Sequence, residues 1–367
     1  MFEFSLTSKQ LLAVGIGAAL ALTLLPQGED PRITRGRALF DKPFRAADGV
    51  GAPEMNADSC RGCHRDPIMG GAGGLELNVT RCGNDNGGAG PFTAPSGGQV
   101  LSKLYPPHIA GREEPGGTFF ADVFEQRQTP TLLGSGLIDT ILAPEILANE
   151  DPFDANSDGI YGVARRLQVN AFEEIGRFGW KAQMPRLADF THDALFGELG
   201  ITTPRNGRGF GSDSDHDNVA DPEISSDAID DLVIFMGQLP APERKGSTDP
   251  RVIAGEQLFT DIGCAKCHIP VLNGANGPVP LYSNLLLHNV MPAGYRGMAE
   301  PGAGVGFFRT PPLWGIGDTA PYMHDGRAED LPAAILAHDG EATAVRLAYE
   351  SRTAAEREAL ILFLGDL

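Results

Sequence analysis

The sequence lacks an excess of positive charge. It has 29 Lys and Arg residues against 48 Asp and Glu residues, which gives a formal net charge of −19 at pH 7. A nucleic-acid-binding protein needs a basic surface, so this balance argues against that class. Five cysteines in 367 residues exclude a disulfide-rich scaffold, and 7% aromatic residues is a modest share. Hydrophobic residues still make up 42% of the chain, which is enough to build buried cores.

Long hydrophobic runs are also scarce, and the clearest one lies at the N-terminus. Residues Leu11 to Leu25 carry no charge, Lys9 precedes them and Pro26 follows them. A membrane-spanning helix needs about 20 apolar residues, so this run is short for one. Its length and position are typical of a secretory signal peptide; an uncleaved membrane anchor and a buried core helix are the alternatives. We therefore expect residues 1–28 to be a signal peptide or anchor and the rest to be exported.

The chain contains an internal repeat. The segment from Asp30 to Phe40 recurs from Asp249 to Phe259, with Asp, Pro, Arg, Gly, Leu and Phe in register. Asp is a good helix N-cap and Pro suits the first helical position, so each copy predicts a helix start. A Gly inside a helix usually marks the close approach of another helix. Each half also ends in a segment with helical apolar spacing, at 226–239 and 353–367.

A Cys-x-x-Cys-His motif follows each copy of the repeat. The residues are Cys60, Cys63 and His64, then Cys264, Cys267 and His268. This is the attachment signature of c-type haem, in which two thiols bond to the porphyrin and the adjacent His binds the iron. A thioredoxin-like dithiol and a zinc ribbon are alternatives, but the His after both motifs and the lack of a βαβ pattern disfavour them. The sequence thus predicts two covalently bound haem c groups.

The motifs and the repeat together predict the domain organisation. A Pro- and Gly-containing linker at 240–247 separates the two halves. We predict an N-terminal haem c domain at 29–245, with a long insertion, and a C-terminal haem c domain at 246–367. The glycine-rich start of the insertion, from Gly70 to Gly98, is expected to be irregular surface loop.

Several segments resemble a known family. They are Arg127–Leu132, Gly136–Ile138, Gly176–Ala182, Phe308–Gly315 and Ala320–Arg327. They resemble the bacterial dihaem cytochrome c peroxidases and, more closely, their relatives the dihaem oxidoreductases. The resemblance covers nearly all of the chain after residue 29. It implies a mainly α fold, with two tandem class I cytochrome c-like domains and long irregular loops, facing each other across a haem pair in a periplasmic protein.

The resemblance also implies a second axial ligand for the C-terminal haem. In the peroxidases this ligand is a Met that lies 14 residues after the His of a Tyr-Phe-His-Asp-Gly stretch. Counting 14 residues from His324 leads to His338, so the resemblance implies that His268 and His338 hold this iron. Two imidazoles stabilise ferric iron more than a His and Met pair does, so this haem should have a low potential. Met323 and Met291 are the alternative ligands.

In the family, the N-terminal haem binds peroxide in an open pocket with a carboxylate as proton carrier. Cleavage of the O–O bond needs such a group. Asp139 and Glu145 are the candidates here, and an ordinary surface role is the alternative for each. His108 and His192 are candidate distal ligands of this haem, or ordinary surface or core residues.

The two tryptophans, Trp180 and Trp314, are candidates for an electron relay between the haems or for plain core residues. The resemblance does not say which of them would have that role. Cys82 has no partner once the four motif thiols are used. It is expected to be a buried or capped free thiol or an intermolecular link, with no redox role.

An acidic loop offers a candidate calcium site. Asp154, Asn156 and Asp158, with a following Gly, match the first half of a calcium loop, and hard cations prefer such oxygen ligands. Arg165 stands where an EF-hand has Glu, so a full EF-hand is excluded. A second run with the same alternation spans 213–218. Solvated acidic turns are the alternative for both segments.

These observations predict a peroxidase-like dihaem oxidoreductase. A small periplasmic donor, a cytochrome c or a cupredoxin, would reduce the C-terminal haem, which would pass electrons to a peroxide-reactive N-terminal haem. The alternatives are an electron-transfer cytochrome without catalysis and an oxidase of a partner protein. No nucleic-acid partner is expected, and an N-terminal membrane anchor remains an alternative to a cleaved signal peptide.

Overall fold

The computed structural model describes residues 30–51, 55–93, 100–101, 103, 121–169, 171–204, 215 and 217–367. The predicted signal peptide or anchor lies outside these residues. Within them, no helix combines the length and the apolar character that crossing a membrane requires.

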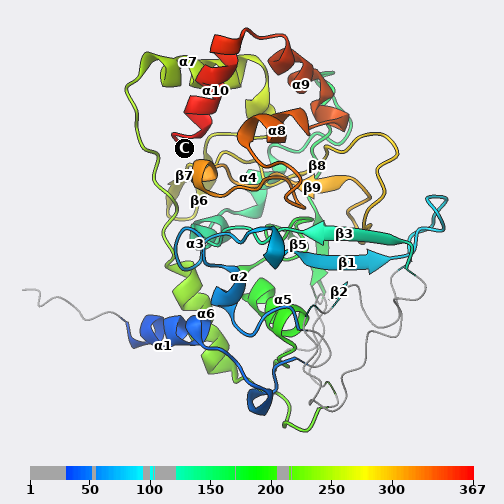
Figure 1. Ribbon diagram of the computed structural model, residues 1–367, viewed down its shortest axis with the longest axis vertical. Helices are drawn as coiled ribbons and strands as arrows, with labels where there is room; N and C mark the ends of the chain where they lie inside the picture. Colours follow the sequence, from blue (N-terminus) through cyan, green and yellow to red (C-terminus); the bar gives the residue numbers. More distant parts are fainter. Residues whose placement is uncertain are drawn as a thin grey trace, which may run out of the picture.

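Short helices and short strands follow one another in groups along the chain (Figure 1). The helices are α1 (Pro31–Asp41), α2 (Cys60–Cys63), α3 (Ser135–Asp139), α4 (Ala143–Leu147), α5 (Leu187–Leu199), α6 (Ser226–Gly237), α7 (Pro250–Asp261), α8 (Leu331–Leu336), α9 (Thr343–Glu350) and α10 (Ala354–Leu364). The strands are β1 (Val79–Gly83), β2 (Val100–Leu101), β3 (Val123–Arg127), β4 (Arg166–Val169), β5 (Phe172–Ile175), β6 (Leu272–Gly274), β7 (Gly277–Val279), β8 (Leu287–Asn289) and β9 (Phe307–Arg309).

The internal repeat forms two equivalent helix pairs at opposite ends of the molecule (Figure 1). Helix α1 packs on α6, and α7 packs on α10. Asp30 and Asp249 cap the first helix of each pair by accepting a hydrogen bond from a backbone N–H two residues on, as predicted. The two crossings share an aromatic contact: Phe40–Phe235 and Phe259–Phe363 both have ring centroids 5.4 Å apart at 63°.

Glycine is required where the helices cross. A Cβ on Gly36 would lie 2.0 Å from the carbonyl oxygen of Asp231, and one on Gly255 would lie 2.0 Å from that of Ala359. Real Cβ atoms essentially never come so close to another atom. The prediction that these glycines mark a close helix approach is therefore confirmed.

Four apolar cores lie among the described residues, the smallest of them around Leu287. The largest contains residues of both halves, such as Phe40 and Leu232 from the first and Leu281 and Trp314 from the second. A second core belongs to the C-terminal half around Phe363, and a third belongs to the N-terminal half. The linker predicted at 240–247 contains no helix or strand. The predicted boundary between the two domains stays a prediction, because the largest core spans it.

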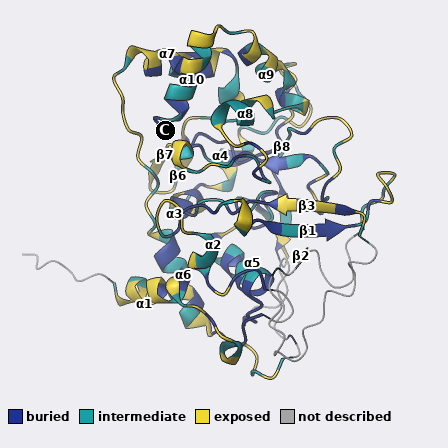
Figure 2. Ribbon diagram, viewed as in Figure 1, coloured by how far each residue is buried: buried dark blue, intermediate teal, exposed yellow. Residues whose placement is uncertain are grey.

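The insertion of the first half contributes a small antiparallel sheet in the order β2-β1-β3. Strand β1 is largely buried, and β3 alternates buried and exposed residues (Figure 2). Strand β1 lies inside the segment from Gly70 to Gly98, so the expectation of irregular surface loop there is wrong. Its main partner, β3, comes from a separate part of the chain, which is why local composition did not indicate a strand. Cys82 lies on β1 and is a buried free thiol.

The prediction of a mainly α fold is wrong. Helices hold 34% of the residues and strands hold 14%. The helices predicted from the repeat and the closing helices are present, but the middle segments of both halves combine further short helices with short antiparallel strands and turns. The long irregular loops that were expected with the two class I cytochrome c-like domains thus contain much of the strand structure.

Candidate haem-binding site

A cavity of about 270 Å³ lies between the segments of the two halves. Its wall is mostly apolar, and it includes both tryptophans, Trp180 and Trp314. Four histidines from the C-terminal half also line it: His268, His288, His324 and His338. A largely apolar cavity with a few polar groups is the usual form of a cofactor site.

His268 is positioned by the second Cys-x-x-Cys-His motif. The motif forms a short 3₁₀ turn, and the backbone N–H of His268 donates to the carbonyl of Cys264 at 3.0 Å. The Nδ1 atom lies 3.0 Å from the carbonyl oxygen of Tyr282. Because a carbonyl only accepts, Nδ1 carries the proton and Nε2 is left as the ligating atom. Burial, with a smaller contribution from His338, lowers the pKa of His268 to about 3, which keeps the ring in the neutral form that binds metals.

The hydrogen bonding and burial of His338 resemble those of His268. His338 follows helix α8, and its Nδ1 atom donates to the carbonyl oxygen of Ala334 at 2.7 Å. Burial lowers its pKa, so the imidazole is neutral and Nε2 carries the lone pair that could bind a metal. The structure thus brings His268 and His338 to one cavity. Met291 and Met323 line the same cavity, so the choice of His338 as the second ligand stays a prediction.

The first motif forms a short α-helix instead of a 3₁₀ turn, but the backbone N–H of His64 donates to the carbonyl of Cys60 at 2.9 Å, as that of His268 does to Cys264. Ser59 caps helix α2 by accepting from the N–H of Gly62 at 3.1 Å, and His64 ends the helix. The Nδ1 atom of His64 lies 3.0 Å from the carbonyl oxygen of Pro130. Burial lowers its pKa to about 4, so this ring is also neutral. His64 does not line the large cavity, but Pro130, which orients it, does.

The four motif cysteines are free, and each is partly exposed. Burial raises the pKa of Cys60 to about 12, of Cys63 to about 11 and of Cys264 to about 12. Cys60, Cys63 and Cys264 are therefore protonated thiols rather than reactive thiolates. Within each motif, both sulfurs and the following His come from one turn of backbone, which suits attachment along one edge of a porphyrin.

Two polar groups of the cavity wall indicate an anionic, hydrogen-bonding ligand. Arg309 is buried, its guanidinium donates to the carbonyls of Gly179 and Thr310, and it pairs with no carboxylate in the described part of the chain. Burial lowers the pKa of this guanidinium to about 10. The Nε1 atom of Trp314 is buried and has no hydrogen-bond partner among the described residues. A haem carries two propionates, so the residues present fit this group.

The candidate proton carriers do not line the cavity. Asp139 ends helix α3 and accepts a hydrogen bond from the N–H of Leu187 at 3.0 Å, which caps helix α5. Asp139 is an exposed residue overall, but desolvation of its carboxyl raises its pKa. Glu145 accepts from the backbone and the side chain of Asn273 at 2.9 and 3.0 Å. The catalytic role of either residue stays a prediction.

The remaining candidates are the possible distal ligands His108 and His192 and the two tryptophans. His192 lies on α5, and its Nδ1 atom is 2.9 Å from the hydroxyl of Thr203, away from the cavity wall. His108 lies outside the described residues. Trp180 and Trp314 both line the cavity, and the indole N–H of Trp180 donates to the carbonyl of Gln128 at 2.8 Å. The geometry therefore leaves both tryptophans as candidates for a relay.

In the first acidic loop, the polar side chains accept hydrogen bonds from the backbone of the loop itself. Asp154 accepts from the N–H groups of Asp158 and Gly159, and Asn156 accepts from that of Asp158. Asp158 also forms an ion pair with Lys266, at 3.0 Å, inside the second haem motif. These contacts already engage the oxygens that would hold calcium, so calcium at this loop stays a prediction.

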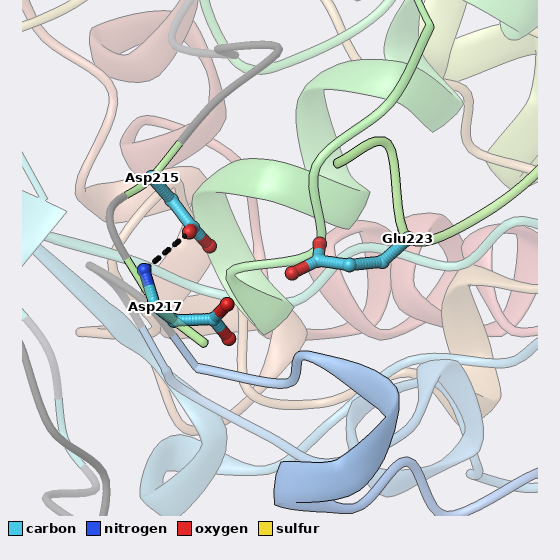
Figure 3. A group of neighbouring side chains, drawn as sticks. All are labelled: Asp215, Asp217 and Glu223. Carbon is cyan, nitrogen blue, oxygen red and sulfur yellow. Dashed lines mark hydrogen bonds between the residues drawn. The ribbon is translucent and has the colours of Figure 1, made fainter. Parts of the chain in front are cut away.

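The second acidic run supplies two members of a carboxylate cluster. Oxygens of Asp215, Asp217 and Glu223 lie within 4.8 Å of one another (Figure 3). Burial raises the pKa of Glu223 to about 7, and the charges of the two aspartates add to this. Glu223 was not part of the sequence prediction, because it follows the run by several residues. Calcium at this cluster also stays a prediction, since acidic groups gather without an ion as well.

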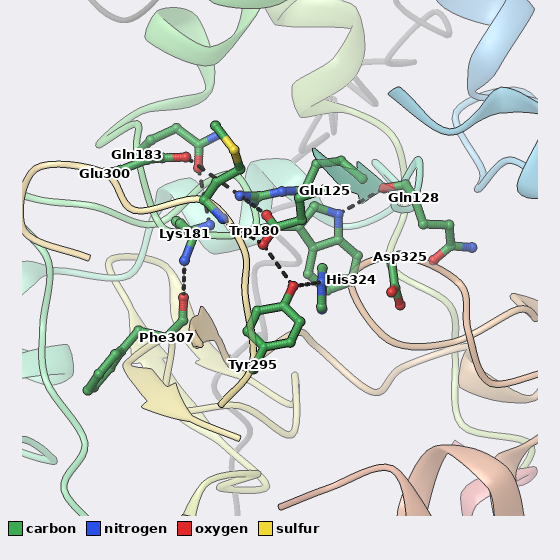
Figure 4. Close-up of polar contacts among 12 residues, drawn as sticks. Glu125, Gln128, Trp180, Lys181, Gln183, Tyr295, Glu300, Phe307, His324 and Asp325 are labelled. Atoms are coloured by element: carbon green, nitrogen blue, oxygen red, sulfur yellow. Dashed lines mark hydrogen bonds and ion pairs between the residues drawn. The ribbon is translucent and has the colours of Figure 1, made fainter. Parts of the chain in front are cut away.

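Two groups of buried polar residues were not predicted from the sequence. His288 lies between Asn284 and Glu341, and the orientation of the Asn284 amide is fixed by its bond to the N–H of Leu286. The second group joins Glu125, Tyr295 and His324 (Figure 4). Each group is assembled from segments far apart in the chain, so of its members only His324, in the segment Ala320–Arg327, stood in a stretch that the sequence had marked.

Comparison with known proteins places the chain in a family. Residues 120–367 match the family model described as "Di-haem oxidoreductase, putative peroxidase". No curated protein sequence matches the chain.

The solved structures similar to this chain are distant. A MauG-like protein associated with microbial copper homeostasis is 18% identical, with 92% of this chain and 88% of that chain covered and a TM-score of 0.47. The dihaem peroxidase BthA from Burkholderia thailandensis is 15% identical, with 93% and 86% covered and a TM-score of 0.46. Hydrazine synthase from Kuenenia stuttgartiensis is 15% identical, with 98% and 100% covered and a TM-score of 0.42. The family match over most of the chain is what identifies it: the protein belongs to the di-haem oxidoreductases, haem enzymes of the peroxidase type.

Proposed function

We propose that the protein is an exported peroxidase with two covalently attached haem c groups. Cys60 and Cys63 would bind the N-terminal haem, with His64 as its axial ligand. Cys264 and Cys267 would bind the C-terminal haem, with His268 as its axial ligand and His338 opposite. The duplicated motif supports this assignment, together with the family's two haems.

The observation that carries the proposal is the pair His268 and His338. Both side chains line one cavity, both donate Nδ1–H to a backbone carbonyl, and both are kept neutral by burial. With Nδ1 protonated, the unprotonated Nε2 of each ring is the atom that could bind iron. Two such histidines on one cavity match the ligand set of a six-coordinate iron.

Bound haem would supply the redox-active iron on which peroxide is reduced: H₂O₂ + 2e⁻ + 2H⁺ gives 2H₂O. The chain must deliver the protons, because a hydroxide-like oxygen leaves poorly until it is protonated. Asp139 is the better-placed carrier. Its neighbour Ile138 lines the cavity, and its raised pKa suits a group that must hold and release a proton. Glu145 is held by Asn273 and is the second candidate.

Electrons would enter at the C-terminal haem and pass to the N-terminal haem. A small periplasmic donor, a cytochrome c or a cupredoxin, would supply them. The uncharged run at 11–25 supports export, and c-type attachment fits an exported protein. Trp180 and Trp314 both line the cavity between the halves and are the candidate relays.

The test is the reaction of the half-reduced holoprotein with hydrogen peroxide in a stopped-flow instrument. A pyridine haemochrome assay on the same sample counts the covalent haems. Two haems per chain and a rapid spectral change of the N-terminal haem would support the proposal. Two haems with no reaction would instead indicate an electron carrier or an oxidase of a partner protein.

A further inference from the structure

A buried series of three hydrogen-bonded side chains reaches the cavity wall. The hydroxyl of Tyr295 lies 2.8 Å from Oε2 of Glu125 and 3.0 Å from Nε2 of His324 (Figure 4). Glu125 is 3% exposed and His324 is 2% exposed. The three residues come from β3 and from two separate segments of the C-terminal half. None of them belongs to a haem motif or was assigned a catalytic role above.

The contacts fix where the protons are. Glu125 accepts from the N–H of Met298 at 3.1 Å and pairs with Arg127 at 2.5 Å, so it is an ionised carboxylate. The desolvation of Glu125 is outweighed by its cationic neighbours, Arg127 first, which lower its pKa. The Tyr295 hydroxyl must therefore donate its one proton to Glu125. It then accepts from Nε2–H of His324, whose pKa burial lowers to about 4.

His324 connects these three hydrogen-bonded side chains to the cavity. Its ring makes an edge contact with Tyr295, at 6.0 Å between centroids, and another with Trp180, at 6.5 Å. It also stacks on Phe308, with centroids 3.8 Å apart at 15°. His324, Trp180 and Phe308 all line the cavity. Tyr295 is therefore in continuous aromatic contact with the space assigned to haem.

We propose that Tyr295 is a redox-active residue, which gives one electron through these rings toward the cavity and its phenolic proton to Glu125. The O–H bond of the phenol breaks and an O–H bond forms on the carboxylate: Tyr–OH + Glu–COO⁻ gives Tyr–O• + Glu–COOH + e⁻. Peroxide is the oxidant, and this electron is one of the two that its reduction to water consumes. The proposal thus rests on the proposed peroxidase function.

The proton acceptor distinguishes Tyr295 from the cavity-lining Tyr322. A phenol that loses an electron becomes a strong acid, so its oxidation is favoured where a base is already hydrogen-bonded to it. Tyr322 donates its hydroxyl to the backbone carbonyl of Ile316 at 2.7 Å, and a carbonyl cannot hold the proton. The two tyrosines differ in this feature, which makes Tyr322 a matched control.

The test is electron paramagnetic resonance of the holoprotein, freeze-quenched after mixing with hydrogen peroxide. Wild type should give a tyrosyl signal that narrows when the protein is grown with ring-deuterated tyrosine. Tyr295→Phe should lose this signal while both haems stay bound, and Tyr322→Phe should keep it. Glu125→Gln should also lose it, because the phenol is retained but its base is gone. A signal unchanged in Tyr295→Phe, or no tyrosyl signal in a wild type that reacts with peroxide, would overturn the proposal.

A second oxidant separates this proposal from the peroxidase function. A soluble ruthenium photo-oxidant removes single electrons from the holoprotein without peroxide. If peroxide does not react but light produces a tyrosyl signal that Tyr295→Phe abolishes, the peroxidase function fails and the role of Tyr295 stands. If peroxide reacts but light gives the same signal in wild type and Tyr295→Phe, the role of Tyr295 fails and the peroxidase function stands.

Discussion

Replacement of Gly255 by Ala should destabilise the protein, because it disturbs the crossing of α7 and α10. The new Cβ would lie 2.0 Å from the carbonyl oxygen and 2.6 Å from the carbonyl carbon of Ala359. Both are backbone atoms, so the helices must separate to relieve the clash. Overpacking costs about 1–3 kcal/mol, and a backbone clash belongs at the upper end of that range. The higher helix propensity of Ala offsets about 1 kcal/mol of this cost, so the free energy of unfolding should fall by about 2 kcal/mol.

The chain supplies a matched control for this substitution. A Cβ on Gly237, at the end of α6, would meet no heavy atom within 4 Å. Gly237→Ala should therefore cost nothing and gain up to about 1 kcal/mol. The assay is urea unfolding of the holoproteins followed by circular dichroism, with the midpoints compared at equal slopes. If Gly255→Ala were as stable as Gly237→Ala, the argument from the helix crossing would be refuted.

Three further predictions concern the haem sites. Cys63→Ala and Cys267→Ala should each leave one covalent haem per chain, and a pyridine haemochrome assay that still returns two would contradict the attachment sites. His338→Met should raise the potential of the C-terminal haem, because a thioether favours ferrous iron; an unchanged potentiometric titration would mean that His338 is not a ligand. Asp139→Asn should slow the reaction with peroxide by about 10²–10⁴, the usual contribution of a positioned acid, and an unchanged stopped-flow rate would make Asp139 a bystander.

The sequence predicted the parts of the fold that local rules decide. Asp249, Pro250 and Gly255 specify a cap, a first turn and a crossing point, and each of these depends only on neighbouring residues and on helix geometry. The closing helices were predicted from their apolar spacing, and α6 and α10 lie within the predicted ranges. The short strands were missed, because β1 and β3 are separate segments and neither indicates its partner.

In the candidate site too, features set by local sequence were predicted and contacts between distant segments were missed. His268 was predicted from its motif and His338 from the family's spacing, and the structure brings both to one cavity. The local sequence around Asp139 could not show that its carboxylate caps α5, because that contact joins residues far apart in the chain. The link between Tyr295 and His324 was missed for the same reason.

The most direct test of the account is the electron paramagnetic resonance spectrum of the fully ferric holoprotein, recorded for wild type and for His338→Ala. We expect two iron signals in wild type: a low-spin signal from the haem between His268 and His338, and a high-spin signal from the N-terminal haem. The substitution should convert the low-spin signal to high spin and leave the other unchanged. Two low-spin signals that do not respond to the substitution or to peroxide would contradict both the ligand assignment and the peroxidase function.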